Sequence, residues 1–178
     1  MRDVVKGIFG TLAVLLVVAL AVISLGAISS NADTKPSVPE TLAAKVSLHA
    51  SLVRQSRGIT DPFPPTDGNL SAGVTSYAEN CVVCHGASDA RESTFSKGFY
   101  IPAPQLAKDG VEDDPAAVTY LKIKHGIRFS AMPAFGATLP DKTLWQLTQF
   151  LRRMDRLPAP IEAKWKSVPS AADPARVR

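Results

Sequence analysis

The stretch Cys81-Val82-Val83-Cys84-His85 contains both cysteines of this 178-residue chain and one of its three histidines. Cysteines three residues apart lie on the same side of a helical turn, so each sulfur can reach a different vinyl group of one haem. The histidine that follows is then directed at the iron, and C-x-x-C-H is a signature of covalent haem attachment. The stretch therefore predicts one haem c bound through Cys81 and Cys84, with His85 as an axial iron ligand.

Two other kinds of site use closely spaced cysteines, and neither finds support along the chain. A thioredoxin-like redox site requires a βαβ context, whereas no segment here has the pattern of a convincing β-strand. A structural zinc site requires four nitrogen or sulfur ligands. Beyond Cys81, Cys84 and His85, only His49 and His125 remain, and they form no second paired motif. We expect His49 to be a surface or packing residue.

A second axial ligand is expected from the opposite face of the haem. Of the three methionines, Met1 is the initiator and Met154 lies at the end of a predicted helix, whereas Met132 lies in a loop between two helices. A thioether in such a loop can approach the iron opposite His85, and His/Met ligation is a common haem pattern. His125 is the competing ligand, and an open position is the third possibility. We predict that His85 and Met132 bind the iron.

The N-terminal segment has the composition of a membrane span. Residues Ile8 to Ile28 contain no charged side chain, and a run of that length can cross a hydrocarbon core of about 30 Å. Arg2 and Lys6 favour a cytoplasmic N-terminus, which places the rest of the chain on the periplasmic side of the cytoplasmic membrane. A cleaved signal peptide, cut near residues 30–32, is the alternative. We predict a retained single-pass anchor over residues 1–28.

Residues 29–67 are predicted to form a juxtamembrane linker, an amphipathic helix and a proline-rich strap. Glu40 to Arg57 has helical periodicity, and Ser37 with Glu40 suggests a capping box. The strap, Thr60 to Asp67, contains three prolines and cannot be helical. The apolar face of the predicted helix consists of Leu42, Val46, Ala50 and Val53. We expect this helix to pack on the domain or to lie near the membrane surface.

An all-α domain is predicted over residues 68–157. Asn69 is a candidate cap for a helix that leads into the cysteine motif, and Asp114 followed by a proline is a good start for a second helix. A third helix is expected from Pro140 or the next residue, with an apolar stripe that includes Phe150. Prolines follow this helix, so we expect residues 158–178 to be an extended tail.

Composition excludes several functions. The formal net charge is only +4, and no basic block is interleaved with aromatic residues, so nucleic-acid binding has no support. No Ser/His/Asp arrangement, phosphate-binding loop or catalytic carboxylate pair stands out. We therefore predict neither enzymatic catalysis nor a small-molecule substrate.

Taken together, the motifs resemble those of class I c-type cytochromes of the membrane-anchored, bacterial, monohaem kind. The resemblance covers Gly68 to Leu157. Pro140, where the family often has a serine cap, and the segment Glu40 to Asp67, which the core family lacks, are departures. The matching positions, in order, are Gly73, Tyr77, Cys81 to Gly86, Pro104-Gln105-Leu106, Gly126, Met132-Pro133-Ala134-Phe135-Gly136, Trp145 and Phe150.

The resemblance implies a role for several of these residues. The carbonyl of Pro104 would accept a hydrogen bond from the ligand His85, and Leu106 would pack on the haem. Gly73 would allow a close helix crossing near Phe150. Tyr77, Trp145 and Phe150 are expected to be packing residues. Simple loop punctuation is the other interpretation of Pro104, because Pro102 stands two residues away.

With both axial positions filled, the predicted function is one-electron transfer between redox proteins. We expect a carrier tethered to the membrane, whose donor and acceptor are membrane respiratory or dehydrogenase complexes. A fixed electron-transfer subunit of a larger membrane dehydrogenase or terminal oxidase is the alternative. A haem enzyme or gas sensor with an open iron position is a third hypothesis.

Overall fold

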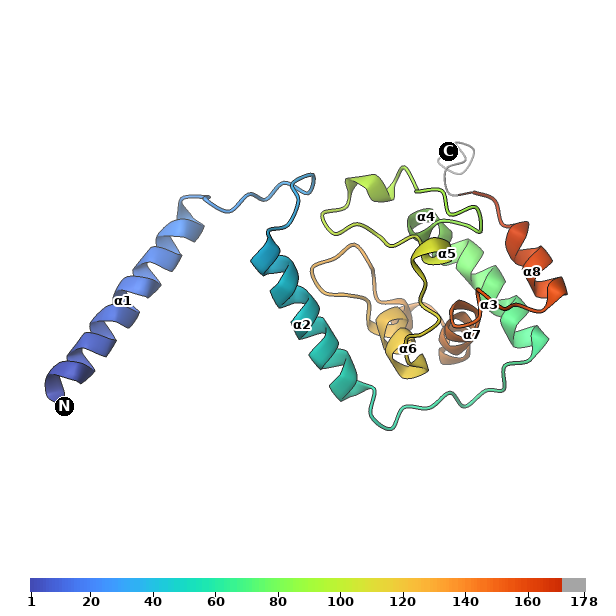
Figure 1. Cartoon of the computed structure of the whole chain (residues 1–178), viewed down its shortest axis with the longest axis horizontal. Coiled ribbons are helices and arrows are strands. Elements are labelled where there is room, and N and C mark those ends of the chain that lie inside the picture. The colour runs from blue at the N-terminus through green and yellow to red at the C-terminus, as the bar shows by residue number, and fades with distance from the viewer. Residues whose placement is uncertain (171–178) are drawn as a thin grey trace. The chain divides into compact units, whose positions relative to one another are not determined.

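A computed structural model of the chain describes residues 1–170, and within that range every regular element is a helix (Figure 1). The all-α prediction is therefore confirmed. The elements are α1 (Arg2–Ser24), α2 (Val38–Gln55), α3 (Asp67–Asn80), α4 (Val82–His85), η1 (Ser96–Gly98), α5 (Leu106–Asp109), α6 (Ala116–His125), η2 (Phe135–Ala137), α7 (Asp141–Leu151) and α8 (Ala159–Lys166).

The chain divides into two compact units, of which the first is Met1–Thr34 and the second begins at Lys35. The first unit contains α1, a helix long and apolar enough to cross a membrane, and all of its residues are exposed. At about 1.5 Å per residue, its 23 residues span about 35 Å. The helix begins earlier than the apolar run and ends at Ser24, just before Gly26, which has a φ of +66°.

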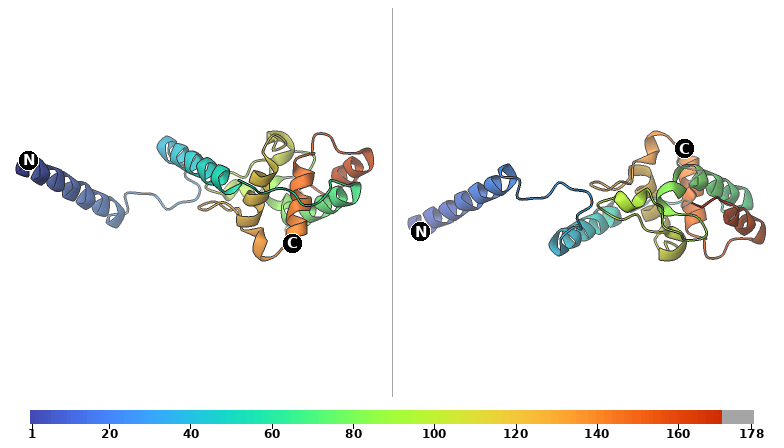
Figure 2. Two further views of the ribbon diagram at one scale, coloured as in Figure 1. Left: turned by 90° about the horizontal axis from the view of Figure 1, so that it is seen from below. Right: turned by 90° about the horizontal axis from the view of Figure 1, so that it is seen from above.

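The second unit is built around the crossing of α3 and α7, with α8 packed beside α3 (Figures 1 and 2). The crossing point is Gly73. A Cβ atom at this position would lie 2.3 Å from the carbonyl oxygen of Gln146 and 2.7 Å from Cβ of Phe150. Only glycine permits this approach, which confirms the close crossing near Phe150 that the sequence predicts.

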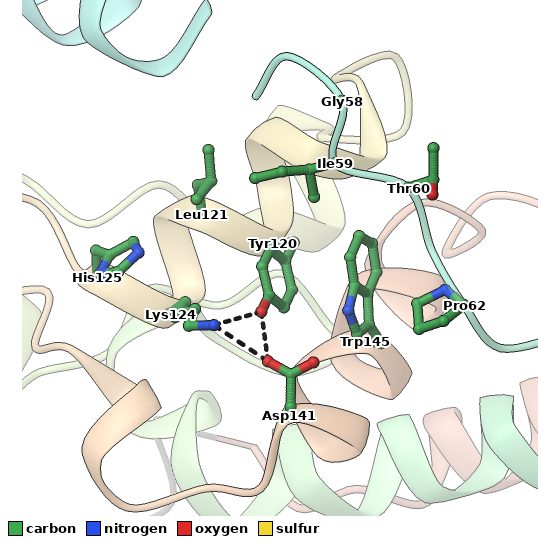
Figure 3. A pocket seen from close by; sticks show the side chains of 10 residues that line it. All are labelled: Gly58, Ile59, Thr60, Pro62, Tyr120, Leu121, Lys124, His125, Asp141 and Trp145. Atoms are coloured by element: carbon green, nitrogen blue, oxygen red, sulfur yellow. Dashed lines mark hydrogen bonds and ion pairs between the residues drawn. The ribbon is translucent and has the colours of Figure 1, made fainter. Parts of the chain in front are cut away.

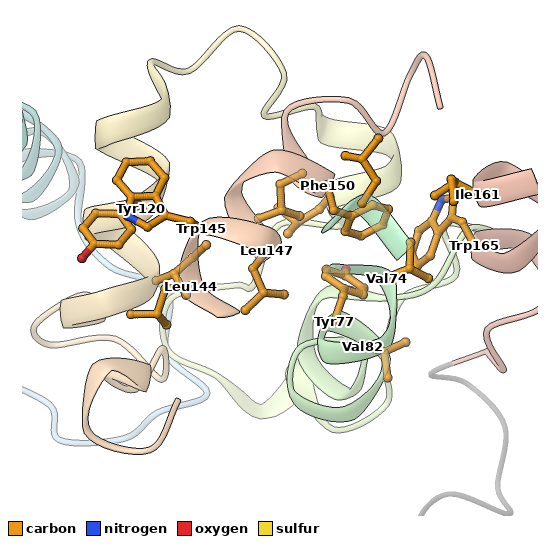
Figure 4. Packing of buried hydrophobic residues seen from close by; sticks show 14 of the residues in the cluster. Val74, Tyr77, Val82, Tyr120, Leu144, Trp145, Leu147, Phe150, Ile161 and Trp165 are labelled. Atoms are coloured by element: carbon orange, nitrogen blue, oxygen red, sulfur yellow. The ribbon is translucent and has the colours of Figure 1, made fainter. Parts of the chain in front are cut away.

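An aromatic cluster fills the interior on one side of this crossing (Figure 4). Tyr77 and Phe150 are fully buried and meet edge to face, with ring centroids 5.5 Å apart. Trp165 contacts both rings at 5.2 Å, also edge to face. Such pairs contribute beyond the burial of their area. The predicted packing role of Tyr77 and Phe150 is confirmed.

The prediction of an extended tail over residues 158–178 is wrong for its first part. Ala159–Lys166 is the helix α8, and Ile161 and Trp165, four residues apart, bury their side chains on one face. Pro158 precedes the helix and Pro160 lies in its first turn, where a missing N–H has no consequence, so these prolines start a helix rather than exclude one. Residues 171–178 lie outside the described part.

The segment before α3 is held to the same core. The capping box predicted at the start of α2 is present, since Ser37 and Glu40 bond each other's backbone N–H groups. The strap that follows is extended, as predicted, apart from its last residue, which begins α3. The buried Gln149 of α7 donates to the Asp61 carboxylate at 2.7 Å and to the Phe63 carbonyl at 2.9 Å. The strap is therefore fastened to α7.

Two predicted helix caps are corrected by the structure. Thr66, not Asn69, caps α3, because its hydroxyl oxygen accepts the backbone N–H of Asn69 at 3.2 Å. Asp114 does not cap α6, whose N-cap is Pro115. The Asp114 carboxylate instead accepts a hydrogen bond from Lys122 of α6 at 2.6 Å.

Candidate haem-attachment site

The cysteine motif forms a single helical turn at the end of α3. Cys81 closes α3 by donating its N–H to the Tyr77 carbonyl at 2.9 Å, and it precedes α4. The N–H groups of Cys84 and His85 both return to the Cys81 carbonyl, at 3.1 and 2.9 Å. Gly86, with a φ of +77°, ends the turn in a conformation that favours glycine. The turn inferred from the spacing is therefore present.

Both thiols are partly buried and free of a disulfide. Burial, with a smaller contribution from the neighbouring Cys84, raises the pKa of Cys81 to about 12, and burial also raises the pKa of Cys84. In residues 1–170 no group of three or more His, Cys, Asp or Glu side chains is placed to hold a metal ion. Burial therefore keeps both sulfurs as neutral thiols near neutral pH.

His85 is oriented by a backbone carbonyl. Its Nδ1 lies 2.9 Å from the carbonyl oxygen of Pro104, 19 residues along the chain, and because a carbonyl can only accept, Nδ1 carries the proton. The lone pair therefore remains on Nε2. Burial lowers the pKa of His85, against a smaller opposite effect of the Pro104 contact. A neutral imidazole with a carbonyl on its second nitrogen is the usual arrangement of a metal-binding histidine, so His85 fits an iron ligand.

Three side chains hold the backbone of the motif. Ser93 donates its hydroxyl to the Val83 carbonyl. The side-chain amide of Gln105 donates to the Cys84 carbonyl at 3.4 Å, and the Tyr77 hydroxyl donates to the Gly86 carbonyl at 2.8 Å. All three side chains belong to buried residues, and the Tyr77 bond is buried while the Ser93 and Gln105 bonds are partly buried. They fix the direction of the turn that carries the cysteines and the histidine.

Sequence reasoning missed these roles of Ser93 and Gln105. Ser93 is fully buried in a loop of polar and small residues, and no local pattern distinguishes it from its exposed neighbours. Gln105 lies inside the Pro104 to Leu106 element, so the sequence indicates this position but not its function. A Cβ at Gly86 would lie 2.3 Å from Oε1 of Gln105, which shows how closely this side chain packs on the motif.

The methionine loop between α6 and α7 is closed by its own backbone. The Ile127 N–H donates to the Met132 carbonyl at 3.2 Å, and the Met132 N–H donates to the Ser130 hydroxyl at 3.2 Å. Gly126 has a φ of +64°, and its Cα lies against the backbone of Met132 and the following proline. A Cβ at this position would lie 2.6 Å from the Met132 carbonyl oxygen. Glycine is required at this position for both reasons.

The remaining predicted site residues border one hydrophobic cluster. Leu106 is buried within it, and Cys81 and Met132 are partly buried against it. The structure thus brings Cys81, Cys84, His85 and Pro104 together through direct contacts. Leu106 and Met132 are connected to these residues through the hydrophobic cluster that Cys81 also borders.

Residues 68–151 match the family described as cytochrome c oxidase, cbb3-type, subunit III. Residues 68–151 form a c-type cytochrome domain. No curated protein and no solved structure matches the chain. Helices α2 and α8 lie outside the matched residues of the cytochrome domain.

A cleft of about 430 Å³ lies away from the cysteine motif (Figure 3). It lies where the strap passes α6 and α7, and three of its side chains are joined by hydrogen bonds. Tyr120 donates to the Asp141 carboxylate, and Lys124 donates to the Tyr120 oxygen at 2.7 Å and to Asp141 at 3.2 Å. The Tyr120 ring stacks on Trp145 with centroids 4.1 Å apart. Because these groups satisfy one another, the cluster fastens α6 to α7.

His125, the competing iron ligand, lines this same cleft (Figure 3). Its side chain is exposed at the end of α6, next to Lys124. None of the cleft residues belongs to the cysteine motif or to the methionine loop. The surroundings of His125 therefore differ from those of Met132, which packs against the cluster that Cys81 also borders.

Proposed function

We propose that this chain is a membrane-tethered one-electron carrier with a single covalently bound haem c. The observation that carries the proposal is the turn Cys81 to His85, in which both thiols and a correctly oriented imidazole lie on one helical turn of a c-type cytochrome domain. Cys81 and Cys84 would hold the porphyrin, and His85 and Met132 would bind the iron. When bound, the haem supplies an iron that alternates between the ferrous and ferric states.

The two proposed ligands determine what the site can do. With an imidazole and a thioether both in place, no iron position is open to a substrate, which favours electron transfer over catalysis. A methionine ligand raises the reduction potential relative to stronger donors. The Pro104 carbonyl keeps the proton of His85 on Nδ1 and fixes the ring orientation, which preserves the same ligand geometry in both oxidation states.

The proposed location is the periplasmic side of the cytoplasmic membrane. The apolar helix α1 is a possible anchor, and Arg2 and Lys6 at its start favour a cytoplasmic N-terminus. A retained anchor would confine the carrier to two dimensions and raise its effective concentration near membrane-bound redox partners. The interfaces between such carriers and their redox partners are typically small, with a buried area below about 1,200 Å².

Absorption spectroscopy of a Met132→Ala variant tests the axial ligation. We expect the weak near-infrared band of sulfur-to-iron charge transfer to disappear from the ferric protein while the haem stays covalently attached. The reduced variant should bind carbon monoxide rapidly, whereas the wild type should not. Met154→Ala is the matched control, because Met154 lies beyond α7, and it should keep the band. Persistence of the band in Met132→Ala would show that another residue is the ligand.

A second candidate function is a fixed electron-transfer subunit of a larger membrane complex. It is favoured by the matched family, whose description names an oxidase subunit. Helices α2 and α8, outside the match, would then offer docking surface. Purification in mild detergent separates the two functions. A stoichiometric partner that co-purifies with the chain supports the subunit, and a chain that purifies alone with its haem supports the carrier.

A further inference from the structure

The outward face of α2 is apolar and uncovered. In a helix, residues 42, 46 and 53 point in nearly the same direction. Val38, Leu42, Val46 and Val53 are 82%, 62%, 60% and 44% exposed, which is unusual for a row of large apolar side chains on one helix. The exposed alanines Ala43 and Ala50 widen the same stripe. His49, also exposed, is the one polar side chain of α2 within this stripe, and an exposed apolar face of this kind normally has a partner.

The opposite face of α2 fixes how the helix sits on the cytochrome unit. Leu48 and Leu52 are partly buried, and Leu52 packs against the hydrophobic core. The Tyr100 hydroxyl donates to the Glu40 carboxylate at 2.6 Å, which holds the first turn. Helix α2 also lies along α6. The exposed stripe therefore cannot turn inward without losing these contacts.

Charge narrows the choice of partner. Lys45 and Arg54 flank the stripe on its two sides, both are exposed, and neither forms a hydrogen bond or ion pair with a residue in the range 1–170. The one acidic residue of α2, Glu40, is turned away toward Tyr100 and the backbone of Ser37. An apolar stripe bordered by cations is the signature of a helix that lies in a lipid surface, with its cations among anionic headgroups.

Chain length keeps this helix close to a membrane. The 13 residues 25–37 connect the end of α1 to the start of α2. At about 3.5 Å per residue, they reach at most about 45 Å when fully extended. If α1 spans the membrane, α2 cannot leave the vicinity of that membrane's surface.

We propose that α2 lies in the surface of the membrane that α1 crosses, with its stripe of Val38, Leu42, Val46 and Val53 in the lipid. This inference rests on the retained anchor of the proposed function, but not on the haem. Because α2 is fastened to α6 and to the loop of Tyr100, binding to lipid holds the cytochrome domain in one orientation at the surface. The domain is then presented to partners in the same membrane rather than rotating freely on its tether.

Spin-label accessibility on the full chain in lipid vesicles tests the proposal. Val46→Cys carries the nitroxide in the haem-loaded chain, in which Cys81 and Cys84 are expected to be thioethers that do not react with the label. Ala44→Cys is the matched control, since residue 44 is exposed and lies nearly opposite residue 46 on the helix. Leu15→Cys, in the middle of α1, reports whether the anchor is inserted. In vesicles of phosphatidylcholine and phosphatidylglycerol, we expect the ratio of oxygen to nickel-chelate collisions to be several-fold higher at residue 46 than at residue 44, and highest at residue 15.

The other outcomes overturn the proposal in distinguishable ways. Equal ratios at residues 46 and 44, with residue 15 in lipid, would show that α2 stays in water beside an intact anchor. Low accessibility to both reagents at residue 46 would show that protein, such as a second copy, covers the stripe. A water-like ratio at residue 15 would show that α1 is not inserted in the membrane, which would contradict both the anchor and this inference. A second variant, Lys45→Glu with Arg54→Glu, should lower the ratio at residue 46 several-fold, and an unchanged ratio would contradict the role of the flanking cations.

Discussion

Helix α3 and its continuation α4 are held by two different kinds of contact. In the middle of α3, Gly73 lies against the backbone of Gln146 and the Cβ of Phe150. The Tyr77 ring packs against Phe150 of α7 and Trp165 of α8. In α4, the backbone carbonyls accept hydrogen bonds from the buried side chains of Ser93 and Gln105. The first kind excludes water from the interior, whereas the second fixes the direction of the backbone without covering the turn.

This difference suits the proposed haem site. A turn that must present two sulfurs and an imidazole cannot be buried under aliphatic side chains, because the porphyrin has to reach all three. Hydrogen bonds to its carbonyls leave the side chains accessible while fixing the backbone. Stability therefore comes mainly from the α3–α7–α8 core, and the orientation of the site comes from the polar contacts.

The largest expected effect is in the apolar region. Trp165→Ala removes a buried indole that contacts Tyr77 and Phe150, so we expect a loss of about 3–5 kcal/mol in the free energy of unfolding. Denaturant unfolding followed by Trp145 fluorescence measures it. Lys166→Ala, next to it and exposed, is the control and should change little. If Trp165→Ala lowers the free energy of unfolding no more than Lys166→Ala does, α8 is not part of the core.

The close contact between α3 and α7 can be tested by adding one methyl group at Gly73. Gly73→Ala places a Cβ against the Gln146 carbonyl, and because a backbone atom cannot move aside cheaply, we expect a loss of about 2–3 kcal/mol. Gly98→Ala is the matched control, since a Cβ there meets nothing within 4 Å. Thermal unfolding of the two variants gives the comparison. A neutral Gly73→Ala would mean that α3 and α7 are not in contact at this residue.

Tyr77 contributes to both regions, because its ring packs in the apolar core and its hydroxyl bonds the Gly86 carbonyl. Substitutions can separate these two contributions. Tyr77→Phe keeps the ring in the core but leaves the buried Gly86 carbonyl without its partner, at an expected cost of about 1–2 kcal/mol. Tyr77→Leu also removes the edge-to-face contacts and should cost more. The unfolding free energies of both variants are to be measured under identical conditions. If Tyr77→Phe is as stable as the wild type, the hydroxyl does not hold the motif.

The smallest effect is expected at Asp141, which joins α7 to α6. Hydrogen bonding from the Tyr120 hydroxyl, with a further contribution from Lys124, lowers the pKa of Asp141 against the opposing effect of burial. A carboxyl with a lowered folded-state pKa stabilises the fold above its unfolded pKa, and this contribution is lost as the pH falls below about 4. Asp141→Asn should therefore flatten the acid side of the profile of melting temperature against pH. An unchanged acid slope would contradict the ion pair.

Much of this architecture could be predicted from the sequence because its signals are local. The cysteine turn follows from five consecutive residues, the capping box from Ser37 and Glu40, and the close crossing from a glycine at a position that resembles a known family. The contact between His85 and Pro104 was also anticipated, although it spans 19 residues, because the resemblance supplied it.

The parts that could not be predicted depend on tertiary context. Pro158 and Pro160 read as helix breakers, and only the burial of Ile161 and Trp165 against α3 shows that they begin a helix. Ser93 has no local feature that marks it, because its role depends on a carbonyl ten residues earlier in the chain. Secondary-structure propensity depends on residues nearby in the sequence, whereas the structure at these positions is determined by tertiary contacts.

The central claim, covalent attachment at Cys81 and Cys84, is tested most directly by the intact mass of the denatured chain. The protein should be produced in a host with haem-attachment machinery and extracted with acidified acetone before mass spectrometry. We predict that the extracted wild-type chain keeps its colour and has the mass of the polypeptide plus one haem, and that Cys81→Ser with Cys84→Ser has the mass of the polypeptide alone. A colourless wild-type chain of unmodified mass would contradict the account.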